Sequence, residues 1–171
     1  LKLKALFVAI EGVDGAGKSQ LARDLAAALC TSETRAICTH EPGSIIEDHI
    51  RGLFKRDSMP GPDYMTLMFT ADRLIHMDTK ILPALAQGIT VICDRHKLST
   101  WVYQTASGAD SDLVRKACDI PQPNPDLTII LDIDPRVAIT RMEGRALDNY
   151  ERNLERQISM RAAYLEHQNR F

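Results

Sequence analysis

The fold of this chain is decided by Gly12-Val13-Asp14-Gly15-Ala16-Gly17-Lys18-Ser19. This stretch follows an apolar run, residues 5–10, and precedes a helix-forming run, residues 21–29. Its glycines let the backbone turn back so that successive N–H groups point inward at an anion. The start of the following helix adds partial positive charge. A strand, this loop and a helix in succession predict a binding site for a polyphosphate, with Lys18 on the outer phosphates and the Ser19 hydroxyl available to magnesium.

Length and composition allow one domain and exclude several partners. The 171 residues are enough for a single hydrophobic core. Hydrophobic residues make up 44% and charged residues 26%, as in an ordinary soluble protein. The net charge of −2 creates no general attraction for nucleic acid or an acidic membrane. No apolar run is long enough to span a bilayer, so we expect neither partner.

The cysteines and histidines indicate no metal centre and a reducing, cytoplasmic location. None of Cys30, Cys38, Cys93 and Cys118 forms a C-x-x-C pair. Cys38 and Cys93 fall inside apolar strand candidates, where a free thiol behaves as a small core residue. Asp72 and His76 stand four apart on a predicted helix, and without a third ligand a local hydrogen bond between them is preferred over a metal site.

Candidate strands alternate with candidate helices along the chain. The apolar runs typical of strands cover residues 5–10, 36–39, 90–94 and 127–133. The helical segments cover residues 21–29, 44–54, 63–86, 99–106, 111–117, a stretch beginning at 135, and 149–168. This alternation predicts an α/β fold: a doubly wound parallel sheet with helices on both faces.

Local signals predict how three of these helices begin or bend. Ser44, with Glu47 three residues later, predicts a capping box. Pro83 predicts a kink in the long helix. Pro135 fits the first turn of the helix that follows the fourth strand.

Polar residues follow three of the predicted strands. They are Asp14, residues 40–44 and residues 94–99. Parallel sheets bind ligands at the carboxyl ends of their strands. We therefore expect these residues and the phosphate-binding loop to form one site.

Five segments carry a resemblance to a known family. They are Glu11–Ser19, Thr39-His-Glu-Pro-Gly43, Phe69-Thr-Ala-Asp-Arg73 with His76, Val91–Gln104 and Pro125–Pro135. In order, they resemble the phosphate loop, the T-R-E-P-G turn, the F-A-A-D-R-x-x-H helix, the D-R-[YH]-x-x-S-x-x-A-Y-Q segment and the fourth strand of the thymidylate kinases. The resemblance implies one P-loop kinase domain over residues 1–171, which transfers the γ-phosphoryl group of ATP to dTMP and forms homodimers.

The resemblance also implies roles for individual residues. ATP would lie on Gly12, Val13, Asp14, Gly15, Ala16, Gly17, Lys18, Ser19 and Gln20. Magnesium would lie near Ser19 and Asp94; a helix cap or an ion pair with Arg95 is the less favoured alternative for Asp94. The catalytic cations would be Lys18, Arg95, Arg141 and Arg145. The residues facing dTMP would be Asp14, Glu41, Pro42, Phe69, Arg73, Arg95, Ser99, Thr100, Tyr103, Gln104, Tyr150 and Glu151.

Several acceptor residues have a specific expected contact. Phe69 would stack on thymine and Arg73 would bond the base, whereas plain core packing is the alternative for Phe69. Asp14 would accept the sugar 3′-hydroxyl. Tyr103 would stand where a ribose 2′-hydroxyl clashes. The polar helix residues beside Tyr103 equally suit a solvent-facing helix side.

A lid is expected at about residues 141–151. Some family members carry an arginine inside the phosphate loop, but this chain has Ala16 there. The charge over the γ-phosphate would then come from Arg141 and Arg145, for which a solvated helix face is the alternative. Tyr150 and Glu151 resemble the pair that closes on the acceptor.

The chain departs from the family pattern at a few positions. Gln20 replaces a usual threonine, and His40 replaces a common arginine. The family continues into a fifth strand beyond the position of Phe171. Two other functions therefore stay open: a kinase for another deoxynucleotide or a small metabolite, and a non-catalytic nucleotide-binding protein.

Overall fold

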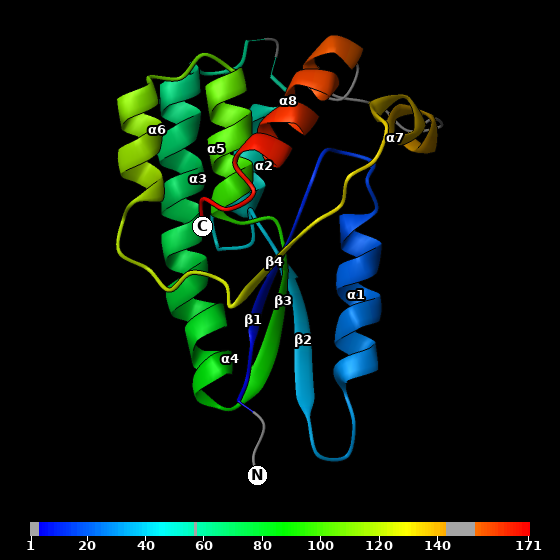
Figure 1. Ribbon diagram of the computed structural model, residues 1–171. Coiled ribbons are helices and arrows are strands. Elements are labelled where there is room, and N and C mark those ends of the chain that lie inside the picture. Colours follow the sequence, from blue (N-terminus) through cyan, green and yellow to red (C-terminus); the bar gives the residue numbers. More distant parts are fainter. Residues whose placement is uncertain (1–3, 57, 143–152) are drawn as a thin grey trace.

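The computed structural model describes residues 4–56, 58–142 and 153–171 (Figure 1). Its four described strands are β1 (Phe7–Glu11), β2 (Arg35–His40), β3 (Ile89–Asp94) and β4 (Leu127–Ile130). They form one parallel sheet in the order β2-β3-β1-β4. The predicted parallel sheet is confirmed, and β4 is shorter than the apolar run that predicted it.

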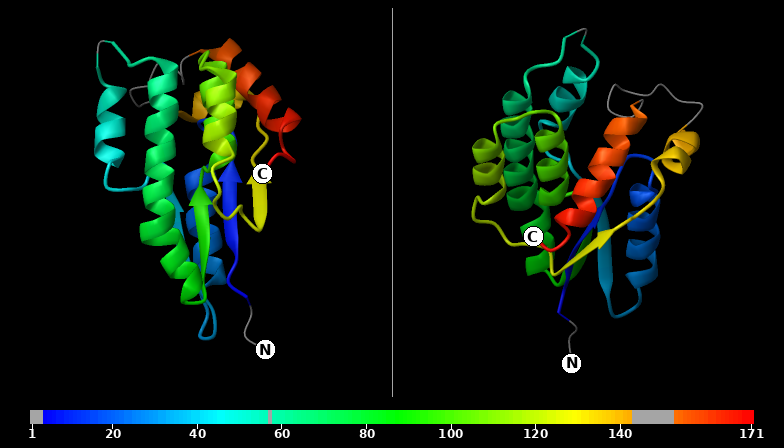
Figure 2. Two further views of the ribbon diagram at one scale, coloured as in Figure 1. Left: turned by 90° about the vertical axis from the view of Figure 1, so that its left-hand side faces the viewer. Right: turned by 45° about the horizontal axis from the view of Figure 1, so that its top comes forward.

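The helices lie on both faces of this sheet (Figures 1 and 2). They are α1 (Lys18–Leu29), α2 (Glu47–Leu53), α3 (Pro62–His76), α4 (Leu82–Ala86), α5 (Lys97–Ala106), α6 (Ser111–Cys118), α7 (Pro135–Met142) and α8 (Leu154–Glu166). The group α3 to α6 stands opposite α1, and α8 packs on α5 and α7. The doubly wound architecture is therefore confirmed.

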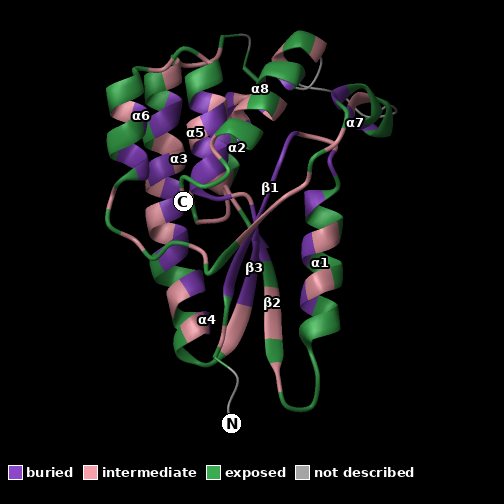
Figure 3. Ribbon diagram, viewed as in Figure 1, coloured by how far each residue is buried: buried purple, intermediate pink, exposed green. Residues whose placement is uncertain are grey.

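The two central strands are buried on both sides, which explains their continuous apolar character (Figure 3). Side chains alternate between the faces of a strand. Val8 and Ile10 of β1 pack with α1, around Ala22. Phe7 and Val91 pack on the opposite face, against the segment that leads into α4.

The long predicted helix is not continuous. A π-helical turn, Met77–Ile81, separates α3 from α4, and Pro83 lies in the first turn of α4. Proline has no N–H, and inside an α-helix its ring would meet the carbonyl four residues earlier. The wider turn relieves that conflict, so the irregularity falls just before the predicted position of the kink.

The predicted capping box is wrong. Helix α2 begins at Glu47 after Ile46, and no side chain caps it. The Ser44 hydroxyl accepts a hydrogen bond from the Ile46 amide (3.2 Å) instead. The Glu47 carboxylate binds His40 and Arg51. The Ser44 amide, which a capping box would pair with the Glu47 carboxylate, donates to the distant Asp72 carboxylate instead (3.0 Å).

All four cysteines are free, and Cys93 is buried as expected for a core thiol. The expectation for Cys38 is wrong, because its side chain is exposed on β2. No helix within the described ranges is long and apolar enough to cross a membrane.

Candidate active site

The phosphate loop lies between β1 and α1 and packs against α7. Gly15 has a φ of +77°, and a Cβ there would stand 2.3 Å from the Ala138 carbonyl oxygen. Only glycine fits this close approach. Lys18 opens α1, and its ammonium group donates to the Val13 carbonyl within the loop (2.8 Å). Burial, reinforced by repulsion from Arg95, lowers the pKa of Lys18 to about 8.

Ser19 and Asp94 meet beside this loop. The Ser19 hydroxyl donates to Asp94 Oδ2, while Oδ1 of Asp94 is buried without a hydrogen-bond partner. Mg²⁺ prefers oxygen ligands, and this pair offers a hydroxyl oxygen and a carboxylate oxygen that has no hydrogen-bond partner. These two residues fit the predicted metal. The ion pair of Arg95 is formed with Asp14.

Arg95 occupies the turn from β3 into α5 with a φ of 74°. Such a backbone is costly for a residue with a side chain and is often found at functional sites. Its Nη2 binds Asp14 and the Tyr103 hydroxyl (3.1 Å), and its Nη1 binds Ser99 Oγ (3.1 Å). Tyr103 also donates to Asp14 (2.6 Å). Residues from the phosphate loop and α5 therefore converge on one guanidinium group.

Asp14 is charged in this arrangement. Burial by itself would raise the pKa of its carboxyl group, but Arg95 and Lys18 hold that pKa below its usual range. Burial disfavours the charge of Arg95, but Asp14, Tyr103, Tyr164 and Asp94 together outweigh that effect and raise the pKa of the guanidinium group.

Glu11, at the end of β1, holds the start of α5. Its buried carboxylate accepts from the His96 amide (2.8 Å), the Ser99 amide (3.3 Å) and the Ser99 hydroxyl (2.5 Å). Helix α5 has no side-chain cap of its own at His96. Glu11 supplies the acceptor instead, and burial raises its pKa.

The polar side of α5 faces the protein rather than the solvent. Ser99, Thr100 and Gln104 are each less than one-tenth exposed, which excludes the alternative of a solvent-facing side for them. Thr100 accepts from Nη2 of Arg73 (3.2 Å), a residue of α3. Two polar atoms here are buried without a hydrogen-bond partner: Nη1 of Arg73 and Oε1 of Gln104.

Phe69 lies one helical turn before Arg73 on α3 and is partly buried. It packs against the cluster of Ile50, Leu53 and Met65, and its ring centroid is 6.3 Å from that of Phe54. The packing role is therefore visible, and stacking on a base stays a prediction.

The turn after β2 contains Glu41 and Pro42, joined by a cis peptide bond. Asp72 of α3 accepts from the backbone amides of Gly43 (2.9 Å) and Ser44 (3.0 Å). The predicted hydrogen bond between Asp72 and His76 is wrong, because the Gly43 and Ser44 amides donate to the two oxygens of the Asp72 carboxylate. Asp72 instead fixes the turn that carries Glu41.

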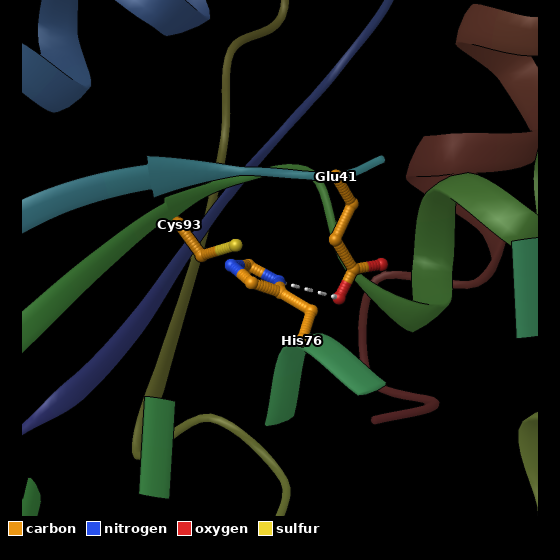
Figure 4. Close-up of side chains that lie close together, drawn as sticks. All are labelled: Glu41, His76 and Cys93. Carbon is orange, nitrogen blue, oxygen red and sulfur yellow. Dashed lines mark ion pairs between the residues drawn. The ribbon is translucent and has the colours of Figure 1, made fainter. Parts of the chain in front are cut away.

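Glu41 forms a buried polar link with two histidines. It accepts from His96 Nδ1 (2.8 Å), and His76 Nδ1 is 3.9 Å from the same oxygen. Figure 4 shows the His76 imidazole beside both the Glu41 carboxylate and the Cys93 thiol. A ring nitrogen of His76, a carboxylate oxygen of Glu41 and Sγ of Cys93 lie within 4.8 Å of one another. The other nitrogen of His76 is bonded to Thr39 (2.7 Å). We interpret the group as a connection between β2, α3 and β3.

The remaining predicted residues are less central or lie outside the described part. Gln20 is exposed and bonds Asp24 along α1 (2.8 Å). Arg141 is exposed in the last turn of α7, the helix against the phosphate loop. Arg145, Tyr150 and Glu151, and hence most of the predicted lid, lie outside the described residues. A separate cavity of about 430 Å³ is lined by Lys97, Asn124 and Arg170, none of them a predicted site residue.

Two residues of the site were not singled out by their chemistry in the sequence. Glu11 appeared only as part of a motif, although a carboxylate that ends a buried strand is itself a signal. Tyr164 of α8 has its hydroxyl 2.8 Å from Ser99 Oγ, and nothing near it in the sequence indicates this contact.

The doubly wound sheet and the loop at its rim place the chain in the class of P-loop nucleotide kinases. Residues 10–171 match the model of the thymidylate kinase family. A thymidylate kinase of Mycoplasmoides gallisepticum is 37% identical over 95% of this chain and 81% of the relative. A probable thymidylate kinase of Archaeoglobus fulgidus is 35% identical over 94% and 81%, and a thymidylate kinase of Bordetella petrii is 39% identical over 93% and 79%.

The chain belongs to the thymidylate kinase family, whose members phosphorylate dTMP to dTDP with ATP. The family prediction is therefore confirmed. The enzyme is an ATP-dependent phosphotransferase, and the P-loop kinase fold predicted from the resemblance is the one that the described residues form.

Proposed function

We propose that Arg95 joins the two halves of the reaction, the transfer of the ATP γ-phosphoryl group to the 5′-phosphate of dTMP. The observation that carries this proposal is the ion pair between Arg95, at the end of β3, and Asp14 of the phosphate loop. A guanidinium group at this position can contact the acceptor phosphate and the transferring group together.

The transfer requires positioning and positive charge more than covalent help. An oxygen of the acceptor phosphate forms the new bond to the γ-phosphorus, and the bond from that phosphorus to the β–γ bridging oxygen breaks. Lys18 and the loop amides hold the donor. Mg²⁺, held near Ser19 and Asp94, would neutralise the β- and γ-oxygens. Arg95 balances the charge on the acceptor side.

Thymine recognition is assigned to Arg73 and Gln104. Each carries one buried polar atom without a partner, a donor on Arg73 and an acceptor on Gln104. Thymine offers the complementary pair on adjacent atoms, a carbonyl oxygen and a ring N–H. Leaving such protein groups unsatisfied costs about 1–3 kcal/mol each, so a matching base is favoured over one that lacks the pattern. Phe69 would stack on the ring, with Ser99 and Thr100 shaping the pocket.

The rest of the acceptor and lid assignments belong to the same proposal. Glu41 and Pro42 would border the dTMP phosphate, and Tyr103 with Asp14 would border its sugar. Arg141 and Arg145 would bring charge to the γ-phosphate, and Tyr150 with Glu151 would close the acceptor side. We also propose a homodimer in a reducing cytoplasm, supported by the exposed Leu67 of α3 and the free cysteines.

The test is ADP formation measured with ATP, Mg²⁺ and a panel of nucleoside monophosphates. We expect turnover that depends on dTMP and exceeds that with dUMP, dCMP, dAMP and the ribonucleotides. The Arg95→Ala variant, purified in parallel, should lose at least about a hundredfold in kcat, which excludes a contaminating kinase. Equal turnover with another acceptor, or hydrolysis of ATP without an acceptor, would contradict the assigned specificity.

A further inference from the structure

Tyr164 extends the set of groups around Arg95 to the C-terminal helix. It lies on α8 and is 1% exposed. Its hydroxyl oxygen is 2.8 Å from Ser99 Oγ, 3.4 Å from Arg95 Nη1 and 3.5 Å from Glu11 Oε2. Helix α8 therefore reaches the Arg95 guanidinium group through the Tyr164 side chain.

The direction of each hydrogen bond follows from counting hydrogens. Glu11 is an acceptor, and Ser99 gives its single hydroxyl hydrogen to Glu11 (2.5 Å). Ser99 Oγ must therefore accept from both Tyr164 and Arg95 Nη1. The Tyr164 oxygen in turn accepts from Nη1. The result is a continuous buried chain that runs from a guanidinium group, through two hydroxyls, to a carboxylate.

This chain of hydrogen bonds holds one edge of the Arg95 guanidinium group. Nη1 faces Ser99 and Tyr164, while Nη2 faces Asp14 and Tyr103 at the rim of the phosphate loop. A planar guanidinium that is fixed along one edge has a fixed orientation along the other. Nη2 is then held beside Asp14 and Tyr103 at the rim of the phosphate loop, where an incoming phosphate would replace one of these two partners as its acceptor.

We propose that Tyr164 is a positioning residue for phosphoryl transfer, acting through Arg95. The inference rests on the proposed role of Arg95. The hydroxyl does not touch the substrates; it keeps Nη1 in place so that Nη2 meets the acceptor phosphate in line with the γ-phosphate.

The aromatic ring and the hydroxyl of Tyr164 have separable roles. The ring packs with Val13, Leu98 and Met160 in a hydrophobic cluster, a task that phenylalanine would also perform. The hydroxyl is the part that needs a polar partner in such surroundings. Tyr164→Phe therefore removes the hydroxyl that would position Arg95 and keeps the packing of the ring.

The experiment is a double-mutant cycle on the full chain. Tyr164→Phe should lower kcat about tenfold and leave the KM for ATP within about twofold, since a small misplacement of a catalytic group is costly in rate. In an Arg95→Lys background, which has no fixed fork of nitrogens, the same substitution should lower kcat by less than about twofold. Ser159→Ala, which removes an exposed hydroxyl from α8, should change neither background.

Three results would overturn the inference. The first is full activity of Tyr164→Phe. The second is an equal loss in both backgrounds, which indicates a structural role alone. The third is a loss of kcat that is matched by a large fall in the thermal unfolding midpoint. Turnover of the unsubstituted protein tests the proposed function separately, and calorimetric binding of dTMP to the four proteins repeats the cycle without turnover.

Discussion

At the scale of single residues, burial gives ordinary side chains unusual chemistry. Lys18 is the lysine that the phosphate-loop motif requires. Its lowered pKa, however, comes from burial and from the neighbouring positive charge of Arg95. The carboxylates of Asp14, Asp94 and Glu11 offset this effect only in part. A polyphosphate brings negative charge to the ammonium group and should raise its pKa again.

The affinity for ATP is therefore expected to depend on pH. Below a pH of about 8, Lys18 is charged both in the free protein and in the complex, and the dissociation constant should be constant. Above that pH the free protein must take up a proton on binding, so affinity should fall by up to about tenfold per pH unit. Calorimetry across this range measures both the affinity and the proton uptake.

The Lys18→Met variant provides the control for this prediction. It should bind ATP weakly at every pH and show no proton uptake in the same window. A flat profile for the unsubstituted protein up to more than one pH unit above 8 would show that the ammonium group is not the titrating site.

At the scale of elements, the turn after β2 depends on close backbone approach. A Cβ on Gly43 would stand 2.0 Å from the His40 carbonyl oxygen and 3.2 Å from His76 Nε2. Asp72 of α3 also holds the amide of this residue. The turn is therefore set by its contact with a helix residue that lies 29 positions further along the chain.

Gly43→Ala should be strongly destabilising. The backbone oxygen cannot move without displacing β2, so we expect a loss of at least about 2 kcal/mol in the free energy of unfolding. A rise in the KM for dTMP should accompany it, because Glu41 moves with the turn. Urea unfolding and steady-state kinetics measure the two effects.

Gly52→Ala is the matched substitution. Gly52 lies inside α2, where an added Cβ meets no atom within 4 Å. Alanine is the better helix former by about 0.5–1 kcal/mol, so this variant should be slightly more stable. Similar losses in both variants would refute the steric argument for Gly43.

At the scale of the whole molecule, Glu41 connects elements that are distant in the sequence. Its carboxylate accepts a hydrogen bond from His96 at the start of α5. It also lies beside His76 at the end of α3 (Figure 4). Burial alone would raise the pKa of this carboxyl group, but the two histidines and Arg73 bring it to about 2. The charged form of Glu41 therefore stabilises the folded state.

Comparison with Glu41→Gln should reveal this contribution as a function of pH. The folded pKa lies below the ordinary value of 4.5, so the stabilisation is complete above pH 4.5 and disappears as the pH falls toward 2. At neutral pH we expect the unsubstituted protein to be more stable by about 3 kcal/mol. Denaturant unfolding at several pH values gives the difference directly.

The exposed Glu33→Gln provides the baseline for these measurements. Its difference from the unsubstituted protein should stay near zero throughout the pH series. If the difference in unfolding free energy between the unsubstituted protein and Glu41→Gln stays the same in acid, the charge of Glu41 does not stabilise the fold. The side chain would then contribute through its shape alone.

The sequence predicted the parts of the fold that depend on near neighbours. The phosphate loop, the parallel strands and the helices on both faces follow from periodicity and from glycine positions, which are local properties. The strand order also brings Asp14, Asp94 and Arg95 to one rim, as the reading of strand ends predicted. Where a local signal competed with a distant partner, as at Ser44 and at Asp72, the local prediction was wrong.

By itself the sequence determined the family, the P-loop kinase fold and the residue types available for catalysis, because these are encoded in short motifs in a fixed order. Only the tertiary structure decided how Arg95 is held and how Glu11 caps a helix from a neighbouring strand. It also decided that Tyr164 reaches the site from the far end of the chain. The physical reason is that hydrogen bonds and burial depend on distance in space, and folding alone brings such distant residues within contact.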